Sequence, residues 1–343
     1  MKLLQDSVFA FVCFLLGVYL IWQEFYQYFY VKPTHSSIKR IPMKKEFFPI
    51  VKVCVDPGFD ANEIRKAGYE TLYALFAGFK TEAEDIFLGW TGKDLKNPSE
   101  VMEETVTLRN NSSLIKSTIF LTYIGEDFRV EEQTERIIYP NGRCIGIPVP
   151  ESMDTAMSLE IELNPMFIKE SAIKELQIFL QDPGRDIKSI SPTSSLSGKT
   201  FLEGYDTIHS LDISIEEQLN DCKVYDDAVD DYATCYEREL VSTFTVLLNC
   251  SPPWFTDARD EICNKKFDLS SELAEAVGMV FFDLFAGTFS SNCSPPCTSI
   301  TYVAKYIRSE PVVDTSRIYI NIPRSVQLIQ EKITVDTLSF ITR

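Results

Sequence analysis

The chain has 343 residues, of which 45% are hydrophobic and 24% are charged, a composition typical of a folded globular protein rather than a disordered one. This length exceeds what one small domain needs, so we expect a large core or a body with several parts. A formal net charge of −17 excludes nucleic-acid binding, which requires clustered Lys and Arg side chains to neutralise phosphates.

The first predicted element lies near the amino terminus, where residues 8–22 are uncharged and almost wholly apolar. An aromatic stretch continues the run to residue 30, and at about 1.5 Å per residue it is long enough to cross a bilayer. Tyr and Trp side chains near its ends suit the membrane interface, and Pro33 is expected to end the helix. The segment therefore predicts a transmembrane helix over residues 8–31.

A cleaved signal peptide is the alternative interpretation of this segment. The apolar part of a signal peptide is shorter and ends in small residues at its cleavage site. Here bulky Trp22, Phe25 and Tyr26 occupy the positions where cleavage would be expected. The aromatic residues thus favour a retained membrane helix.

Strand patterns recur through the next part of the chain. Residues 47–54 have the β-branched and aromatic composition of a buried strand. Further strand-like runs cover residues 117–123, 158–163 and 176–180, and the last ends in the turn Gln181-Asp182-Pro183-Gly184. We therefore expect a strand-rich body.

Other segments have helix or loop character. Apolar residues recur at helical spacing over residues 61–80. Residues 91–114 are polar and contain Gly, Asn and Pro, which indicates a surface region, and the Ser/Thr-rich residues 189–200 indicate a loop.

A cysteine-rich block follows at residues 221–297, with helix-like segments at 235–248 and 270–287. Strand-like segments at residues 299–307 and 318–322 come after it. The chain as a whole therefore predicts an α+β fold, in which a disulfide-rich helical block is attached to a β-rich body.

Basic residues and cysteines give opposite indications of the side of the membrane on which this body lies. Five basic residues closely follow the predicted helix and only Lys2 precedes it, which by the positive-inside rule favours the cytoplasm. Eight of the nine cysteines lie after the helix, an even number that suits pairing in an oxidising compartment. These eight are Cys54, Cys144, Cys222, Cys235, Cys250, Cys263, Cys293 and Cys297.

Sequons for N-glycosylation agree with the cysteines. They begin at Asn110, Asn111, Asn249 and Asn292. We give the cysteines more weight than the basic residues. The prediction is a protein of the plasma membrane with residues 1–7 in the cytoplasm and residues 32–343 outside the cell.

Motifs for catalysis, metal binding and nucleotide binding are not found. Only Cys293 and Cys297 are closely spaced, and the two histidines, His35 and His209, lie far from them, which argues against a zinc site. The chain has no G-x-S-x-G elbow and no G-x-G-x-x-G or G-x-x-x-x-G-K-[ST] loop. We therefore predict no enzymatic activity, no cofactor and no metal site.

Five short motifs together carry a resemblance to one family. They are FPIVKVC at residues 48–54, Gly142-Arg143-Cys144, Asp182-Pro183-Gly184, NCSPPW at residues 249–254 and CSPPC at residues 293–297. These motifs resemble those of the degenerin/epithelial sodium channel family, in which they mark the strand after the first membrane helix, the G-x-C and D-P-G motifs, and the cysteine-rich thumb. Gly68-Tyr69 and Gly89-Trp90-Thr91-Gly92 are similar to the invertebrate members.

The resemblance implies a hand-shaped ectodomain with a β-rich palm, an inner β-ball, a helical finger and knuckle, and a disulfide-rich helical thumb. By position it implies a palm strand at residues 47–55, a finger-like region at 60–140, β-ball and palm at 141–220, the thumb at 221–297 and returning palm strands at 298–336. The first membrane helix would precede this ectodomain.

The resemblance also implies a function. Family subunits assemble as homo- or hetero-trimers around one pore in the lipid bilayer and mediate amiloride-sensitive sodium ion transport, gated by a ligand or another stimulus. Tyr30 lies where a family wrist aromatic would lie, although an interfacial belt residue is an equal alternative. Asp226, Asp227, Asp230 and Asp231 could sense protons, but a charge run on a loop is more often a solvated surface.

Counting alone allows 15 connectivities for the six cysteines of the block. By resemblance, Cys54 would pair with Cys144. The remaining implied pairs are Cys235 with Cys297, Cys250 with Cys293 and Cys222 with Cys263.

Two motifs of the family are missing from this chain, the His-Gly motif before the first helix and the G-x-S selectivity filter of the second helix. Residues 337–343 lie about where the second helix should begin, so the chain resembles a truncated subunit with no pore-filter residue of its own. The alternatives are a single-pass receptor or adhesion protein and a non-conducting regulatory subunit.

Overall fold

The computed structural model describes most of the chain. The described residues are 15–23, 34–80, 97–108, 114–153, 155–170, 173–188, 190, 204–219, 222–225, 231–255, 262–263, 265–266, 272–312 and 315–333.

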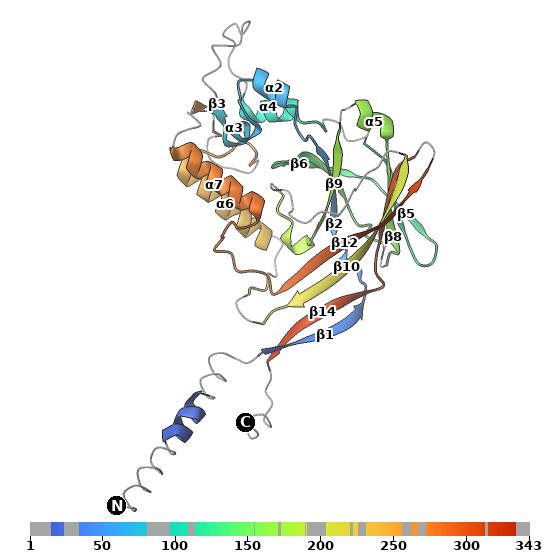
Figure 1. Cartoon of the computed structure of the whole chain (residues 1–343), viewed down its shortest axis with the longest axis vertical. Coiled ribbons are helices and arrows are strands. Elements are labelled where there is room, and N and C mark those ends of the chain that lie inside the picture. The colour runs from blue at the N-terminus through green and yellow to red at the C-terminus, as the bar shows by residue number, and fades with distance from the viewer. Residues whose placement is uncertain are drawn as a thin grey trace, which may run out of the picture.

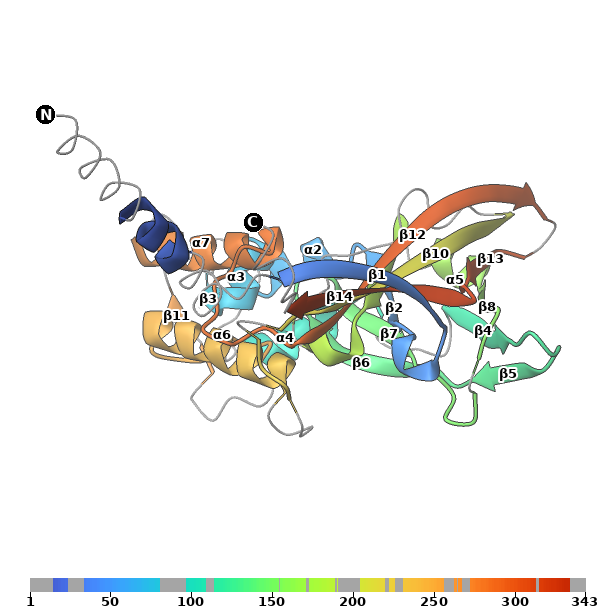
Figure 2. The ribbon, with the colours of Figure 1, turned by 90° about the horizontal axis from the view of Figure 1, so that it is seen from below.

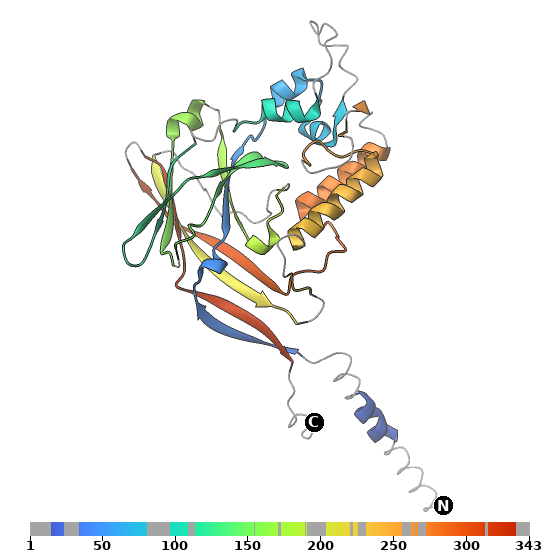
Figure 3. The same cartoon turned by 180° about the vertical axis from the view of Figure 1, so that it is seen from behind.

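The body contains a large mixed β-sheet and a smaller antiparallel one, with helices gathered mainly at one side of the molecule (Figures 1 and 3). The large sheet contains β1 (Thr34–Pro42), β4 (Ile115–Leu121), β5 (Asp127–Val130), β8 (Ser158–Leu163), β10 (Tyr205–Glu217), β12 (Thr298–Pro311), β13 (Arg317–Asn321) and β14 (Ser325–Ile333). Its strands follow the order β1-β14-β10-β13-β8-β4-β5, and β12 pairs with β10.

Strand β10 organises the large sheet. It is antiparallel to β12 along its whole length, and on its other side it pairs in parallel with β13 through its first half and with β14 near its end. Its side chains alternate in burial, with Leu211, Ile213 and Ile215 in the core. This period of two is the pattern of a strand that covers a core with one face.

The first and last strands of the body are neighbours. Strand β1 is antiparallel to β14, and the register pairs Thr34 with Ile333 and Pro42 with Ser325. The start of β1 and the end of β14 therefore lie side by side, as Figures 1 and 2 both show, and in Figure 1 they form the lower edge of the sheets.

The smaller sheet has the strand order β6-β7-β2-β9. Its strands are β2 (Ile50–Asp56), β6 (Gln133–Ile138), β7 (Gly142–Ile147) and β9 (Glu175–Gln181). The Cys54–Cys144 disulfide joins β2 to β7 where the two residues face each other in the ladder. Gly142 begins β7 with φ +77°, a left-handed conformation that favours glycine. The backbone conformation therefore explains why the G-x-C motif has glycine at this position.

The helices are mostly short, apart from two. They are α2 (Ala61–Lys66), α3 (Leu72–Ala77), α4 (Pro98–Thr105), α5 (Pro165–Glu170), α6 (Tyr232–Leu248) and α7 (Glu272–Ala286), with single 3-10 turns η2 (Lys45–Phe47) and η5 (Pro183–Arg185). A two-stranded pair, β3 (Phe79–Lys80) and β11 (Lys265–Lys266), lies among them. Asp231 caps the start of α6 by accepting from Thr234 N at 2.6 Å.

The body has two main hydrophobic cores. The first lies among the strands of both sheets and includes Val53, Ile145, Ile161 and Ile178. The second lies among the helices and includes Phe76 and residues of α6 and α7. Helices α2, α3, α4, α6 and α7, which we name the helical block, thus form a packed unit with its own core.

These elements confirm the α+β fold class and most of the predicted segments. The structure has α6 and α7 where helices were predicted, and β4, β8, β9, β12 and β13 where strands were predicted. Within residues 91–114, however, the expected surface region contains the helix α4, whose Val101 and Met102 are buried. Most of the predicted loop at 189–200 lies outside the described residues.

Only part of the predicted membrane helix is described. Residues 15–23 are helical and expose their large apolar side chains, with Trp22 at 70% and Tyr19 at 61%. Among the residues that the structure describes, no helix is both long enough and apolar enough to span a membrane.

Candidate functional site

A polar site that connects several elements lies at the end of β9, around the turn η5, which carries the D-P-G motif. We name residues 182–186 the junction turn. It contacts three elements that are far apart in the sequence, namely β12, β2 and the first turn of α6. The junction turn therefore connects the small sheet, the large sheet and the helical block.

Asp182 fixes this turn with both carboxylate oxygens. Its Oδ1 accepts a hydrogen bond from Gly184 N at 2.9 Å, which closes the turn. Its Oδ2 accepts from Ile300 N of β12, also at 2.9 Å. Because the side chain is 9% exposed, both bonds are shielded from water. The Asp of the motif thus joins β9 to β12.

Replacing Asp182 by alanine is expected to destabilise the body by about 2 kcal/mol, since two hydrogen bonds to a charged acceptor are lost and buried N–H groups are left unpaired. Denaturant unfolding followed by fluorescence would measure the change. The matched variant Asp182→Asn keeps one acceptor oxygen and should lose roughly half as much. Equal losses for the two variants would contradict this account.

Two other side chains of the junction turn reach outwards. Arg185 places its guanidinium 5.7 Å from the centroid of the Tyr232 ring at the start of α6, a distance typical of a cation–π contact. Asp186 Oδ1 lies 2.7 Å from Lys52 Nζ of β2. The turn therefore holds the helical block and the small sheet through different side chains.

Lys52 is the most deeply buried charged group of the site, at 0% exposure. Its ammonium binds Asp186 at 2.7 Å and Glu135 Oε2 of β6 at 3.1 Å, and each carboxylate side chain is 20% exposed. Two carboxylates around one lysine leave one net negative charge. Burial of an ammonium is tolerated only with such pairing.

The described disulfides correct the predicted pairing. They join Cys54 to Cys144, Cys222 to Cys297, Cys235 to Cys293 and Cys250 to Cys263. The Cys54–Cys144 pair is confirmed, whereas the expected pairs Cys235–Cys297, Cys250–Cys293 and Cys222–Cys263 are wrong.

The geometry of the helical pair explains the correction. Helices α6 and α7 lie side by side (Figure 1) and run antiparallel, so the segment before α6 meets the segment after α7. Just after the end of α6, Cys250 pairs with Cys263, which lies further along the segment that leads to α7. The three bonds are therefore nested one inside another, and the expected Cys222–Cys263 pair would have crossed this hairpin.

An aromatic cluster holds the helical block against the small sheet. It consists of Phe76 of α3, Tyr139 after β6, Phe244 of α6, Trp254 in the segment after α6, and Phe281 of α7. Tyr139 lies 4.7 Å from both Phe76 and Phe281 between ring centroids, and Trp254 is 2% exposed. Burial raises the pKa of the Tyr139 hydroxyl. The sequence motif contained Trp254 but did not indicate the rings that surround it.

A charged cluster on β8, β10 and β13 involves Arg317. Its side chain lies 3.4 Å from Glu160, and its backbone N–H donates to Asp206 at 3.1 Å. Burial raises the pKa of the Glu160 and Asp206 carboxyls, whereas a hydrogen bond from Lys116 lowers the pKa of Glu162. The three strands thus share one partly buried polar contact.

His209, like Lys52, is a buried titratable group that the sequence did not indicate as a site. It lies on β10 opposite Tyr306 of β12, with the two ring centroids 5.8 Å apart, and it is 0% exposed. In the described part of the chain neither ring nitrogen has a hydrogen-bond partner. Burial lowers the pKa of the imidazole, because it disfavours the charged form.

The body is therefore expected to lose stability as the pH falls below about 6.5, the usual pKa of histidine in an unfolded chain. Between that pH and the lowered pKa of the folded state, the unfolded chain takes up a proton that folded His209 does not. Denaturation midpoints between pH 7.5 and 5.5 would measure this loss.

The variant His209→Phe should lack this component of the pH dependence. It should also be more stable at pH 7.5 by about 1–3 kcal/mol, because it buries no unpaired ring nitrogen. A matched change at the exposed ring of Tyr306, Tyr306→Phe, should leave the pH dependence intact. An unchanged pH profile in His209→Phe would show that other groups control acid stability.

The remaining predicted site residues are only partly placed. Asn249 and Asn292 are exposed; Asn249 ends α6 with φ +55°, and Asn292 donates its backbone N–H to Glu239 of α6. Asn110, Asn111 and Tyr30 lie outside the described residues, as do three of the four clustered aspartates. The fourth, Asp231, is the cap of α6 described above.

No known family model matches this chain, and no curated protein matches its sequence.

Proposed function

We propose that this chain is a subunit of a trimeric, amiloride-sensitive sodium channel of the degenerin/epithelial sodium channel type. In this proposal residues 8–31 anchor it in the plasma membrane and residues 32–343 lie outside the cell. The observation that carries the proposal is the β1–β14 pair, because its register brings Thr34, just after the apolar segment, beside Ile333. An ectodomain placed between two membrane helices needs its ends at one place.

Two further features support the proposal. The four described disulfides suit an oxidising, extracellular environment. The exposed apolar side chains of residues 15–23 would be covered by lipid rather than left in water. The mixed α+β body, with a disulfide-stapled helical pair beside the sheets, is compatible with the palm and thumb of such a subunit.

The junction turn gives this proposal a mechanism. A stimulus that moves the helical block would act on Arg185 through Tyr232, and on β12 through Asp182. Strand β12 is paired with β10, and β10 with β14, whose end lies beside the start of β1. Motion would thus reach the strand pair next to the membrane through a continuous hydrogen-bonded ladder.

Topology is the first test. The chain expressed in cells should gain mobility on a gel after glycosidase treatment, and a tag after Arg343 should be labelled from outside the cell. The variant Asn292→Gln should reduce the glycosidase shift if that exposed sequon is used. Absence of any shift, together with cytoplasmic labelling of the tag, would overturn the proposed orientation.

Ion transport is the second test, and it uses the chain with a second membrane helix. A conducting path needs a polar lining, and residues 8–22 supply none. Residues 1–343 alone should therefore carry no amiloride-sensitive current, whereas the chain followed by a second helix with a G-x-S filter should carry one. Surface expression and trimer formation without any current would favour the non-conducting subunit or receptor instead.

A further inference from the structure

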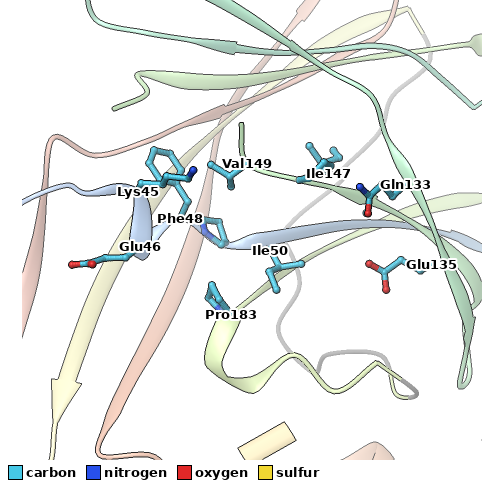
Figure 4. A pocket seen from close by; sticks show the side chains of 12 residues that line it. Lys45, Glu46, Phe48, Ile50, Gln133, Glu135, Ile147, Val149 and Pro183 are labelled. Atoms are coloured by element: carbon cyan, nitrogen blue, oxygen red, sulfur yellow. The ribbon is translucent and has the colours of Figure 1, made fainter. Parts of the chain in front are cut away.

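A pocket of about 790 Å³ lies on the small sheet beside the junction turn (Figure 4). Its walls come from the entry into β2, from β6, from the end of β7 and from Pro183 of the junction turn. The lining is mainly apolar, with Phe48, Ile50, Ile147 and Val149 among its members. A concave site of this volume with few polar groups is the usual form of a small-molecule site.

Glu135 is the polar group that distinguishes one end of this pocket. Its carboxylate points towards Ile50 in the pocket (Figure 4). Lys52 Nζ lies 3.1 Å from its Oε2, while its Oε1 lies against Gly146 of β7. A register irregularity between Thr134 and Ile137 of β6 places this side chain. A Cβ at Gly146 would lie 2.6 Å from Oε1, so the glycine leaves the carboxylate room.

The charges at this end do not cancel. Lys52 is shared between Glu135 and Asp186, so this group carries one net negative charge next to an apolar wall. At the other end, Lys45 already donates to the carbonyl of Glu151 at 2.8 Å, and Glu46 pairs with Lys44. The carboxylate end therefore favours a cation that also has an apolar body.

We propose that this pocket binds a small hydrophobic amine, with the ammonium group on Glu135 Oε1 and the apolar body against Phe48, Ile147 and Val149. This inference goes beyond the proposed channel function and holds whether or not the chain conducts ions. A ligand here would contact both the small sheet and Pro183 of the junction turn. Binding would therefore stabilise the folded arrangement of that turn.

The probe is 4-phenylbutylamine, with 4-phenylbutan-1-ol as its neutral isostere and 4-phenylbutyrate as its opposite in charge. Calorimetric titration of the full chain in lipid nanodiscs, with empty nanodiscs as reference, separates binding from partition into lipid. The amine should bind at least about tenfold more tightly than the alcohol, because a charge-assisted hydrogen bond is made in a partly desolvated site. The butyrate should bind most weakly.

Three variants test the site, with disulfide mapping and thermal unfolding as checks of the fold. Glu135→Gln keeps a hydrogen-bonding side chain but removes the charge, so amine affinity should fall about tenfold while alcohol affinity stays within twofold. Val149→Phe should fill the pocket and weaken both ligands. Asp212→Asn, which changes an exposed carboxylate paired with Lys305, is the matched control and should change neither.

The binding measurements can contradict the proposed amine site in two ways. Equal binding of amine and alcohol, or amine binding that persists in both Glu135→Gln and Val149→Phe, would overturn it. If Glu135→Gln does not fold, Asp186→Asn removes the same net charge from outside the pocket and should weaken the amine alone. Loss of channel activity in the transport test would leave these binding results unaffected.

Discussion

Replacing Lys52 by methionine is expected to lower the free energy of unfolding by about 3–5 kcal/mol, the usual cost of removing one partner of a buried ion pair. Without the lysine, Glu135 and Asp186 would face each other with no cation between them, and each is only 20% exposed. Denaturant unfolding of the purified chain, followed by the fluorescence of buried Trp254, would measure the loss.

Two controls make this prediction specific. The triple variant Lys52→Met, Glu135→Gln, Asp186→Asn should recover most of the lost stability, because it leaves no uncompensated charge. Lys305→Met removes one partner of an exposed pair with Asp212, in which both side chains are more than 60% exposed, and should change stability by less than about 1 kcal/mol. A similar loss in Lys52→Met and Lys305→Met would refute the buried network.

Removing the Cys54–Cys144 disulfide, by alanine at both positions, is expected to destabilise the body by about 4 kcal/mol. The bond closes a sequence separation of 90 residues between β2 and β7, and both cysteines are 0% exposed. Its loss therefore releases a long loop in the unfolded chain and leaves a void in the small sheet.

The matched comparison is the pair Cys250–Cys263, which closes a separation of only 13 residues. Its removal should cost less, about 3 kcal/mol or below, because a short loop loses less entropy on closure and the two outer bonds of the helical block remain. Unfolding of both double variants under one set of conditions would give the order. The reverse order would show that packing around Cys263, rather than loop closure, dominates.

Local patterns in the sequence were sufficient for much of the secondary structure. The apolar spacing of α6 and α7, the β-branched residues of β4 and the apolar–polar alternation of β8 are all local features of the sequence, so these elements could be predicted without the fold. Helix α4 was missed because Asn97, Pro98 and Ser99 resemble a loop, although Asn97 caps the helix and Pro98 begins it.

Contacts between distant segments could not be predicted in the same way. The strand predicted at residues 47–54 is β2, and the sequence did not indicate that it would lie in the small sheet. Strand β14 pairs with β1, a strand that was not predicted from the sequence. The predicted pairing of the six cysteines was wrong for the same reason, because their order in the sequence does not show which ends of α6 and α7 meet.

The amino-acid sequence by itself determined the class of the fold, the apolar segment near the amino terminus, the number of cysteines available after it and the turn at Asp182. Only the tertiary structure decided that Lys52, within an apolar strand, meets Glu135 and Asp186, which lie 83 and 134 residues further along the chain. It likewise decided the three nested disulfides and the pocket. The physical reason is that periodicity and turn chemistry act between neighbours, whereas charge pairing, cross-linking and cavities depend on which distant segments pack together.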